Sequence, residues 1–140
     1  MAFKEKMAAA QGGAANGKIV ASLQSRGLHD QVPCADAESI VWELAFEMRE
    51  IGRTLDVLGI RISRCQLGLF GYDERGKIVQ AAESVTPELQ QALRAALVAE
   101  RLPCSAAWEI ARRLGVSRSA VASAGEALGI KIKPCQLGAF

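Results

Sequence analysis

The chain contains one stretch of sequence twice, and this duplication strongly limits the folds that it can adopt. Residues 33–70 align with residues 103–140 without a gap, and 14 of the 38 aligned pairs are identical. The matches include Leu58-Gly59-Ile60 with Leu128-Gly129-Ile130, and Cys65-Gln66-Leu67-Gly68 with Cys135-Gln136-Leu137-Gly138. Because the repeat is longer than the units of helical solenoids, we expect two similar small modules rather than an array.

Residues 107–126, in the second copy, have small and apolar side chains where two helices that cross at a sharp turn need them. Gly115 can take the left-handed conformation of such a turn, and the Ser117 hydroxyl can cap the helix that follows. The residues expected to line the first helix and close the core are Ile110, Ala111, Leu114, Val116, Val121 and Ala124.

The LGVSRSAV part of this stretch resembles the helix-turn-helix superfamily of bacterial transcription regulators. The resemblance covers residues 107–126 and implies DNA binding, with the N-terminal end of the second helix in the major groove. It departs from the family at Ala124, where a larger aliphatic residue is usual. We expect looser packing there, or Leu128 filling the space.

Each copy is expected to contain three helices followed by a short extended segment. Lys18 to Gly27 has apolar residues at helical spacing, and Thr86-Pro87-Glu88 is a favourable helix start. After the third helix both copies continue with Leu-Gly-Ile, a basic residue and Ile, which predicts a strand; a turn at Asp73 to Gly76 predicts a hairpin wing. The predicted fold is mainly α: two tandem three-helix helix-turn-helix modules, each with a short β-strand or wing after the third helix.

The expected domain order is a flexible N-terminal arm (1–16), a degenerate acidic module (17–80), a linker (81–86) and a basic module (87–140). Residues 17–86 contain eight basic and ten acidic residues, whereas residues 87–140 contain seven and four. We therefore expect the second module to contact DNA.

The first copy differs from the helix-turn-helix pattern around its turn. Val41 and Ala45 replace the small residue and the glycine of the pattern, and carboxylates are present at Glu43, Glu47 and Glu50. Because carboxylates would repel phosphates, we expect this copy to be a dimerisation or docking surface.

The second copy offers arginine and serine side chains for DNA. Arginine can bind guanine through two hydrogen bonds, serine can reach a base or a phosphate, and lysines behind the helix can contact the backbone. Arg112 and Arg113 are alternatively solvated residues on the outer face of a helix. The candidate DNA-binding residues are Ser117, Arg118, Ser119, Ser123, Arg112, Arg113, Lys131 and Lys133.

Each repeat has two cysteines with thirty residues between them. Four thiolates can hold zinc or an iron–sulfur cluster, but zinc sites usually have two cysteines a few residues apart. We expect the thiols to pack in the core and no bound metal; the alternative is a metal or redox site at Cys34, Cys65, Cys104 and Cys135. A redox switch would require the two cysteines of one repeat to approach one another.

Other functions find little support in the sequence. No apolar run is long enough to span a bilayer, and the N-terminus lacks the apolar centre of a secretion signal, so we expect a cytoplasmic protein that does not bind membranes. The only histidine, His29, lies in a polar stretch, and Gly76-Lys77 is followed by Ile78 rather than serine or threonine. We expect no catalytic residues, no enzyme activity and no cofactor. Trp42 and Trp108 are interpreted as packing residues.

The main hypothesis is a sequence-specific protein that binds double-stranded DNA, a transcription regulator whose two fused modules replace the dimer of single-module regulators. One alternative is a protein-interaction or assembly module that retains the helix-turn-helix shape without binding DNA. A second is a cysteine-based metal- or redox-sensing regulator. Whether the chain forms a homodimer is left open.

Overall fold

The computed structural model describes residues 15–139, and this part of the chain is mainly helical, with six α-helices and one parallel sheet of two strands. Of the expected N-terminal arm, residues 1–14 lie outside the described residues. Between residues 15 and 139, no helix combines the length and the apolar character that crossing a bilayer requires.

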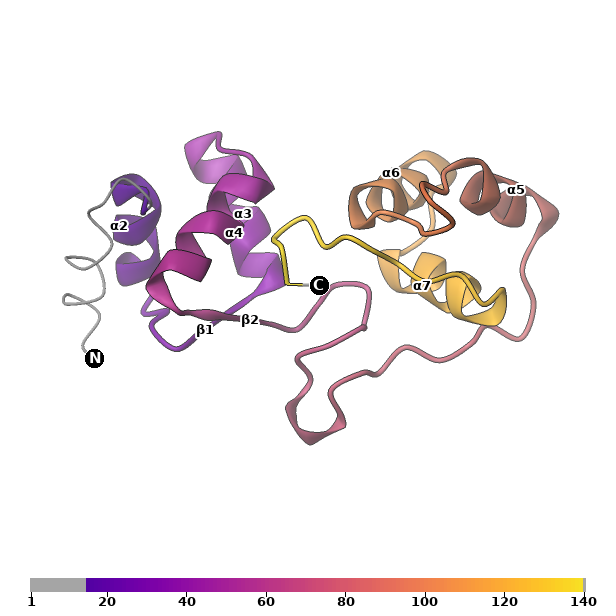
Figure 1. Cartoon of the computed structure of the whole chain (residues 1–140), viewed down its shortest axis with the longest axis horizontal. Coiled ribbons are helices and arrows are strands. Elements are labelled where there is room, and N and C mark those ends of the chain that lie inside the picture. The colour runs from indigo at the N-terminus through magenta and orange to yellow at the C-terminus, as the bar shows by residue number, and fades with distance from the viewer. Residues whose placement is uncertain (1–14, 140) are drawn as a thin grey trace. The chain divides into compact units, whose positions relative to one another are not determined.

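The described residues form two compact units, each built around three helices (Figure 1). Unit 1 comprises residues 15–65 and Leu137–Ala139, and unit 2 comprises Gln66–Gln136. The elements of unit 1 are α2 (Gly17–Ser25), β1 (Gln31–Pro33), α3 (Cys34–Leu44), α4 (Met48–Leu58) and β2 (Arg61–Ser63). Those of unit 2 are the short 3-10 helix η1 (Asp73–Arg75), α5 (Pro87–Ala95), α6 (Cys104–Leu114) and α7 (Arg118–Ala127). Residues 66–80, expected in the first module, therefore lie in unit 2.

The two units repeat the same order of helices at the offset of the duplicated sequence. Helices α2 and α5 each have nine residues, and α3 and α6 each have eleven. Residues 31–40 and 101–110 also have the same sequence of buried and exposed positions. Leu23 and Leu93, which occupy matching positions in the first helix of each unit, are both fully buried. The structural duplication thus begins earlier in the chain than the aligned sequences.

The first helix of each unit begins at a polar cap. In α2, the Asn16 side chain accepts hydrogen bonds from the backbone N–H groups of Lys18 and Ile19. In α5, the Thr86 hydroxyl accepts from the N–H of Leu89 at 3.2 Å, and a proline occupies the first turn. The predicted start of α5 is confirmed. Asn16, expected at the end of the arm, instead belongs to the folded unit.

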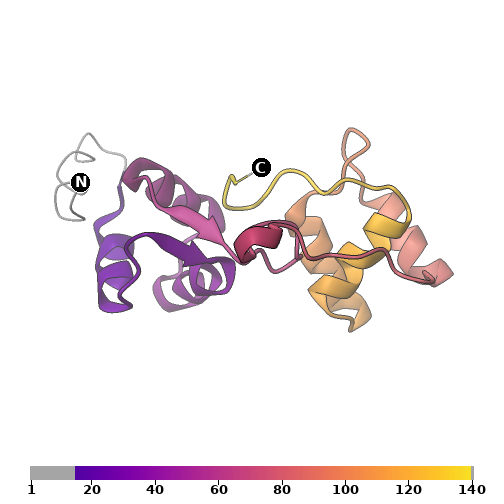
Figure 2. The ribbon, with the colours of Figure 1, turned by 90° about the horizontal axis from the view of Figure 1, so that it is seen from below.

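Each unit is closed by a parallel contact between the segment that precedes its second helix and the segment that follows its third. In unit 1, β1 pairs with β2 and Val32 lies opposite Ile62; Figure 2 shows the two strands side by side. In unit 2, a single bridge joins Leu102 to Ile132, the matching residues of the second repeat. The predicted strand after the third helix is therefore confirmed in unit 1 and reduced to one bridge in unit 2.

The hairpin wing expected around Asp73 to Gly76 does not form. This segment is the 3-10 helix η1, closed by one antiparallel bridge between Tyr72 and Gly76. The physical reason is the direction of the next backbone donors, because the N–H groups of Ile78 and Val79 both bond to the carbonyl oxygen of Gly68. These donors are unavailable to a second wing strand.

The Cys-Gln-Leu-Gly motif of each repeat places its leucine in the unit built mainly from the other repeat. Leu137 is buried in unit 1, and a Cβ atom on Gly52 of α4 would overlap the backbone carbonyl of Leu137. Leu67, the matching residue of the first repeat, is fully buried and belongs to unit 2. In both repeats, the motif therefore supplies a buried leucine to the unit that the other repeat mainly builds.

We predict that Gly52→Ala lowers the free energy of unfolding by about 2 kcal/mol, because the new methyl group displaces Leu137 from its buried position. Urea unfolding followed by circular dichroism measures the change. Gly125→Ala is the matched control. A Cβ there comes no closer than 3.6 Å to the Ile130 carbonyl oxygen, so we expect no loss and a gain of up to about 1 kcal/mol.

A second control removes residues 137–140, after which Gly52→Ala should no longer destabilise the chain. If Gly52→Ala costs the same with and without these residues, the contact between Gly52 and Leu137 is not what the substitution disrupts.

Candidate nucleic-acid interface

Helices α6 and α7 of unit 2 are joined by a three-residue turn with the predicted geometry. Gly115 ends α6 in the left-handed conformation, with φ at 67°. The N–H of Val116 bonds to the carbonyl oxygen of Ala111, and the Ser117 hydroxyl accepts from the N–H of Ala120 at 3.0 Å. The predicted turn at Gly115 and the predicted helix cap at Ser117 are confirmed.

Most of the buried residues of α6 and α7 are small. The buried residues of the two helices are Cys104, Ala107, Ile110, Ala111, Val121, Ala122, Ala124 and Gly125. Ala124 is fully enclosed although it is smaller than the residue usual in the family, and Leu128 is half-buried. Val116, predicted in the core, is 38% exposed. That prediction is wrong, because Val116 contributes its backbone N–H to the turn while its side chain stays at the surface.

The N-terminal end of α7 brings three of the candidate DNA-binding residues together. Ser117 and Ser119 are exposed, and their hydroxyl oxygens lie 3.1 Å apart. Arg118 is half-buried, with its guanidinium carbon 3.6 Å from the centre of the Trp108 ring. Its Nη1 donates a hydrogen bond to Oε1 of Gln66 at 2.8 Å. Arg118 is thus fixed in position by two side chains that the sequence did not connect with it.

The remaining candidates lie at three other places in unit 2. Arg112 is exposed and its Nε donates to Glu109 of the same helix, whereas Arg113 makes no ion pair with any residue between 15 and 139. Lys131 and Lys133 are exposed on either side of Ile132. Ser123 is half-buried and its carbonyl oxygen accepts from the N–H of Ala82. Residues of the expected linker therefore run beside α7.

Helices α3 and α4 of unit 1 make the same kind of turn without glycine. Ala45 ends α3 in the left-handed conformation, with φ at 59°. This conformation is unfavourable for residues with a Cβ atom. Contacts elsewhere in unit 1 must therefore stabilise it at Ala45. The turn therefore has the same left-handed backbone conformation in both units.

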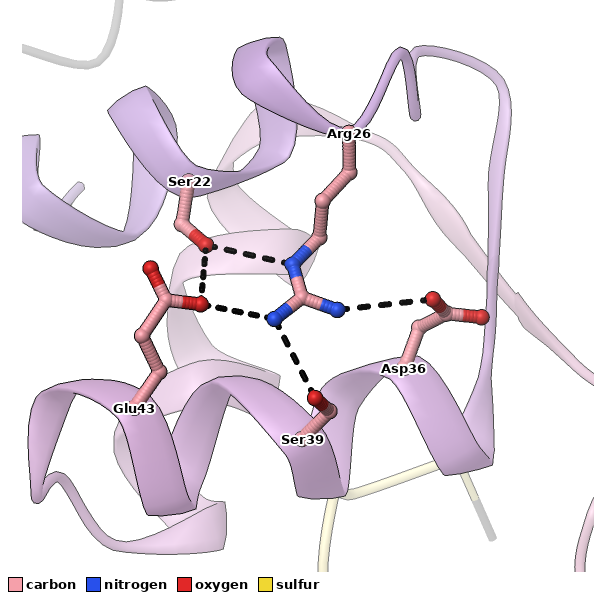
Figure 3. A network of polar contacts seen from close by, with 5 residues as sticks. All are labelled: Ser22, Arg26, Asp36, Ser39 and Glu43. Carbon is pink, nitrogen blue, oxygen red and sulfur yellow. Dashed lines mark hydrogen bonds and ion pairs between the residues drawn. The ribbon is translucent and has the colours of Figure 1, made fainter.

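A polar network ties α2 to α3 in unit 1 (Figure 3). The Arg26 guanidinium donates to Glu43 Oε2 at 2.7 Å and to Ser39 Oγ at 3.2 Å, and it lies 3.6 Å from Asp36 Oδ1. Its Nε also donates to Ser22 Oγ at 3.3 Å. The matching residue of Arg26 in unit 2 is Ala96, so the second unit holds its first two helices together without this network.

The carboxylates expected to make unit 1 acidic are largely engaged within it. Glu43 pairs with Arg26, and Glu50 pairs with Arg53 on the same helix. The hydrogen bond from Arg53 holds the pKa of the Glu50 carboxyl below its usual value, and a hydrogen bond from Asn16 acts in the same direction. Glu47 is exposed immediately before α4. Two of the three carboxylates around this turn are therefore each paired with an arginine, and Glu47 is the one that the predicted repulsion of phosphates still rests on.

The two tryptophans occupy different environments. Trp108 is half-buried beside Arg118, in agreement with the expected packing role. Trp42 is 80% exposed on α3, so the packing role predicted for it is wrong. Its matching residue in the second repeat is the exposed Arg112, which shows that this face of the helix points outward in both units.

The cysteines are present as thiols, two in each unit. Cys34, Cys65 and Cys104 are buried, as expected for core thiols, and Cys135 is half-buried. Among residues 15–139, no group of three or more potential metal ligands comes together. The alternative of one four-cysteine metal site thus gains no support from the geometry of the described residues.

Sequence reasoning missed Gln66, Trp108 and Arg26 as partners in these sites. For Gln66 a signal existed, because the Cys-Gln-Leu-Gly motif is duplicated and a repeated motif indicates a repeated contact. In the structure Gln66 accepts a hydrogen bond from Arg118, and Gln136 donates one to the Cys104 thiol.

Comparisons with protein-family models, with curated proteins and with solved structures found no match. Function has to be inferred from the residues of this chain.

We predict that Arg26→Ala lowers the free energy of unfolding by about 1–2 kcal/mol, because it removes several charge-assisted hydrogen bonds from a side chain that is only 25% exposed. Arg53→Ala is the matched control. It removes one ion pair between neighbouring turns of a helix, and we expect no measurable change. Urea unfolding of both variants measures the difference. Equal effects would show that the Arg26 network contributes no more than an ordinary surface pair.

Proposed function

We propose that the protein binds double-stranded DNA in a sequence-specific way and acts as a transcription regulator, with α7 of unit 2 as its recognition helix. In this proposal both units are helix-turn-helix modules. The observation that carries it is the geometry of the turn: Gly115 in the left-handed conformation, the Ser117 cap, and an exposed N-terminal end on the helix that follows. In DNA-binding proteins of this kind, that end of the helix meets the base edges.

The exposed basic residues of unit 2 support phosphate contacts. Arg112 and Arg113 stand near the end of α6, and Lys131 and Lys133 follow α7, so basic residues flank the proposed recognition helix in the sequence. Phosphate contacts of this sort position a protein on the duplex and make its affinity depend on salt.

Arg118 is the proposed base-reading residue. Trp108 and Gln66 hold its guanidinium at the N-terminal end of α7. A side chain that is already ordered loses less conformational entropy on binding than a mobile one. Ser119, the exposed residue next to it, is the second base contact in this proposal.

Unit 1 lacks this chemistry at the matching positions. Glu47, Met48 and Arg49 stand where the second repeat has Ser117, Arg118 and Ser119. We therefore assign DNA recognition to unit 2.

Selection from a random pool of duplexes, followed by titration at several salt concentrations, tests the proposal. We expect one enriched sequence and an affinity that falls steeply with salt. Lys131→Ala should reduce the slope of log affinity against log salt by about 1 and leave sequence preference intact. Arg118→Ala should reduce sequence preference more than non-specific attachment.

Arg61→Ala is the matched control for Lys131→Ala, because Arg61 occupies the same position in unit 1 and should leave the slope unchanged. Circular dichroism confirms that each variant is folded. A pool without an enriched sequence, together with a flat salt dependence, would rule out DNA recognition by this chain.

A second candidate function is a protein-interaction module in unit 1, in the form of self-association. The observation that favours it is Trp42, which is 80% exposed, since tryptophan is enriched among the residues that dominate protein interfaces. In this reading unit 1 joins two copies of the chain.

Sedimentation equilibrium tests self-association. We expect dimers at micromolar concentration and a much weaker dimer for Trp42→Ala, because the substitution removes a large apolar contact. Val98→Ala is the control, since Val98 is also well exposed but lies in unit 2. A monomer at all accessible concentrations would remove this candidate.

A further inference from the structure

We propose that Cys104 and Cys135 of unit 2 form a reactive thiol pair that low-molecular-weight disulfides oxidise to an intramolecular disulfide. The pair is a modification site, and it does not depend on the proposed binding of DNA. No residue proposed to contact DNA takes part in it.

The backbone of unit 2 brings the two cysteines together. The N–H of Cys104 donates to the carbonyl oxygen of Pro134 at 3.0 Å, and Pro134 directly precedes Cys135. With standard bond lengths, this hydrogen bond limits the distance between the two α-carbons to about 7 Å. Disulfides join α-carbons up to about 6.8 Å apart, so this upper limit lies at the edge of the range that a disulfide spans.

The Cys104 side chain faces the segment that contains Cys135. Its sulfur accepts a hydrogen bond from Nε2 of Gln136 at 3.5 Å, and Gln136 is the residue after Cys135. Cys104 is also the first residue of α6, where the helix dipole favours negative charge. Both features place partial positive charge beside this sulfur, which is the atom that attacks the mixed disulfide in the second exchange.

Exposure decides which thiol reacts first. Cys135 is half-buried, whereas Cys104 is only 5% exposed. An external disulfide therefore reaches Cys135, and Cys104 is placed to complete the reaction.

The reaction consists of two thiol–disulfide exchanges. The Cys135 thiolate attacks one sulfur of the external disulfide, which forms a mixed disulfide and releases one small thiolate. The Cys104 thiolate then attacks the Cys135 sulfur, which forms the protein disulfide and releases the second small thiolate. Two protein thiols are oxidised, the external disulfide is reduced to two thiols, and the two protons go to the released thiolates.

Unit 1 holds a matched pair that should be protected. Cys34 follows β1 and Cys65 lies two residues after β2, and Pro33 is opposite Ser63 in the parallel register, so the chain brings these cysteines near one another too. Both are buried, at 7% and 5% exposure. An external disulfide cannot reach either thiol without opening the unit.

The experiment treats the full chain with oxidised glutathione, alkylates the remaining thiols and analyses the peptides by mass spectrometry. We expect a peptide pair joined through Cys104 and Cys135, and alkylated Cys34 and Cys65. Cys104→Ser should stop the reaction at glutathione on Cys135. Cys135→Ser should prevent modification, and Cys34→Ser should change nothing.

Two results would overturn the proposal. One is a wild-type chain in which glutathione stays on Cys135, since Cys104 would then be unable to resolve it. The other is oxidation of the pair in unit 1 as fast as the pair in unit 2 while circular dichroism shows a folded chain. Because the readout is a covalent mass change in the absence of DNA, its outcome is separate from the test of DNA recognition.

Discussion

Parallel hydrogen bonds join the segment before the second helix to the segment after the third in each unit, and the rest of the unit is arranged around this closure. In unit 2 the N–H of Leu102 bonds to the Lys131 carbonyl, and the N–H of Lys133 bonds back to the Leu102 carbonyl. In unit 1, β1 and β2 make the corresponding ladder. A three-helix unit this small buries little core, so these hydrogen bonds add stability that the core alone does not supply. The same pairing brings Cys104 near the segment that contains Cys135.

Local features of the fold could be predicted from the sequence because they depend on neighbouring residues. The caps at Thr86 and Ser117 and the turn at Gly115 each satisfy backbone groups within one helical turn. Val116 and Trp42 could not be placed in this way, since their exposure depends on what the rest of the unit covers. The predicted wing is absent because of a contact that sequence patterns do not reveal. The backbone N–H groups that a second wing strand would need instead bond to the carbonyl oxygen of Gly68.

The sequence could predict which residues lie at the candidate site, but it could not predict which side chains they contact. The exposed residues at the start of α7 follow from the position of the cap, but Arg118 is held by Gln66, which lies 52 residues away in the chain. Likewise, Glu43 looks like an unpaired carboxylate in the sequence and is paired with Arg26 in the fold. The sequence lists which charges are present, but only the fold shows which of them are paired.

The placement of Leu67 and Leu137 has an evolutionary consequence. Each leucine is buried in the unit that the other repeat mainly builds, and Gly52 leaves room for the backbone at Leu137. A deletion that removed either half of the gene would leave the surviving half with an uncovered apolar side chain and an empty place in its core. We therefore expect either half on its own to be less stable than it is within the whole chain.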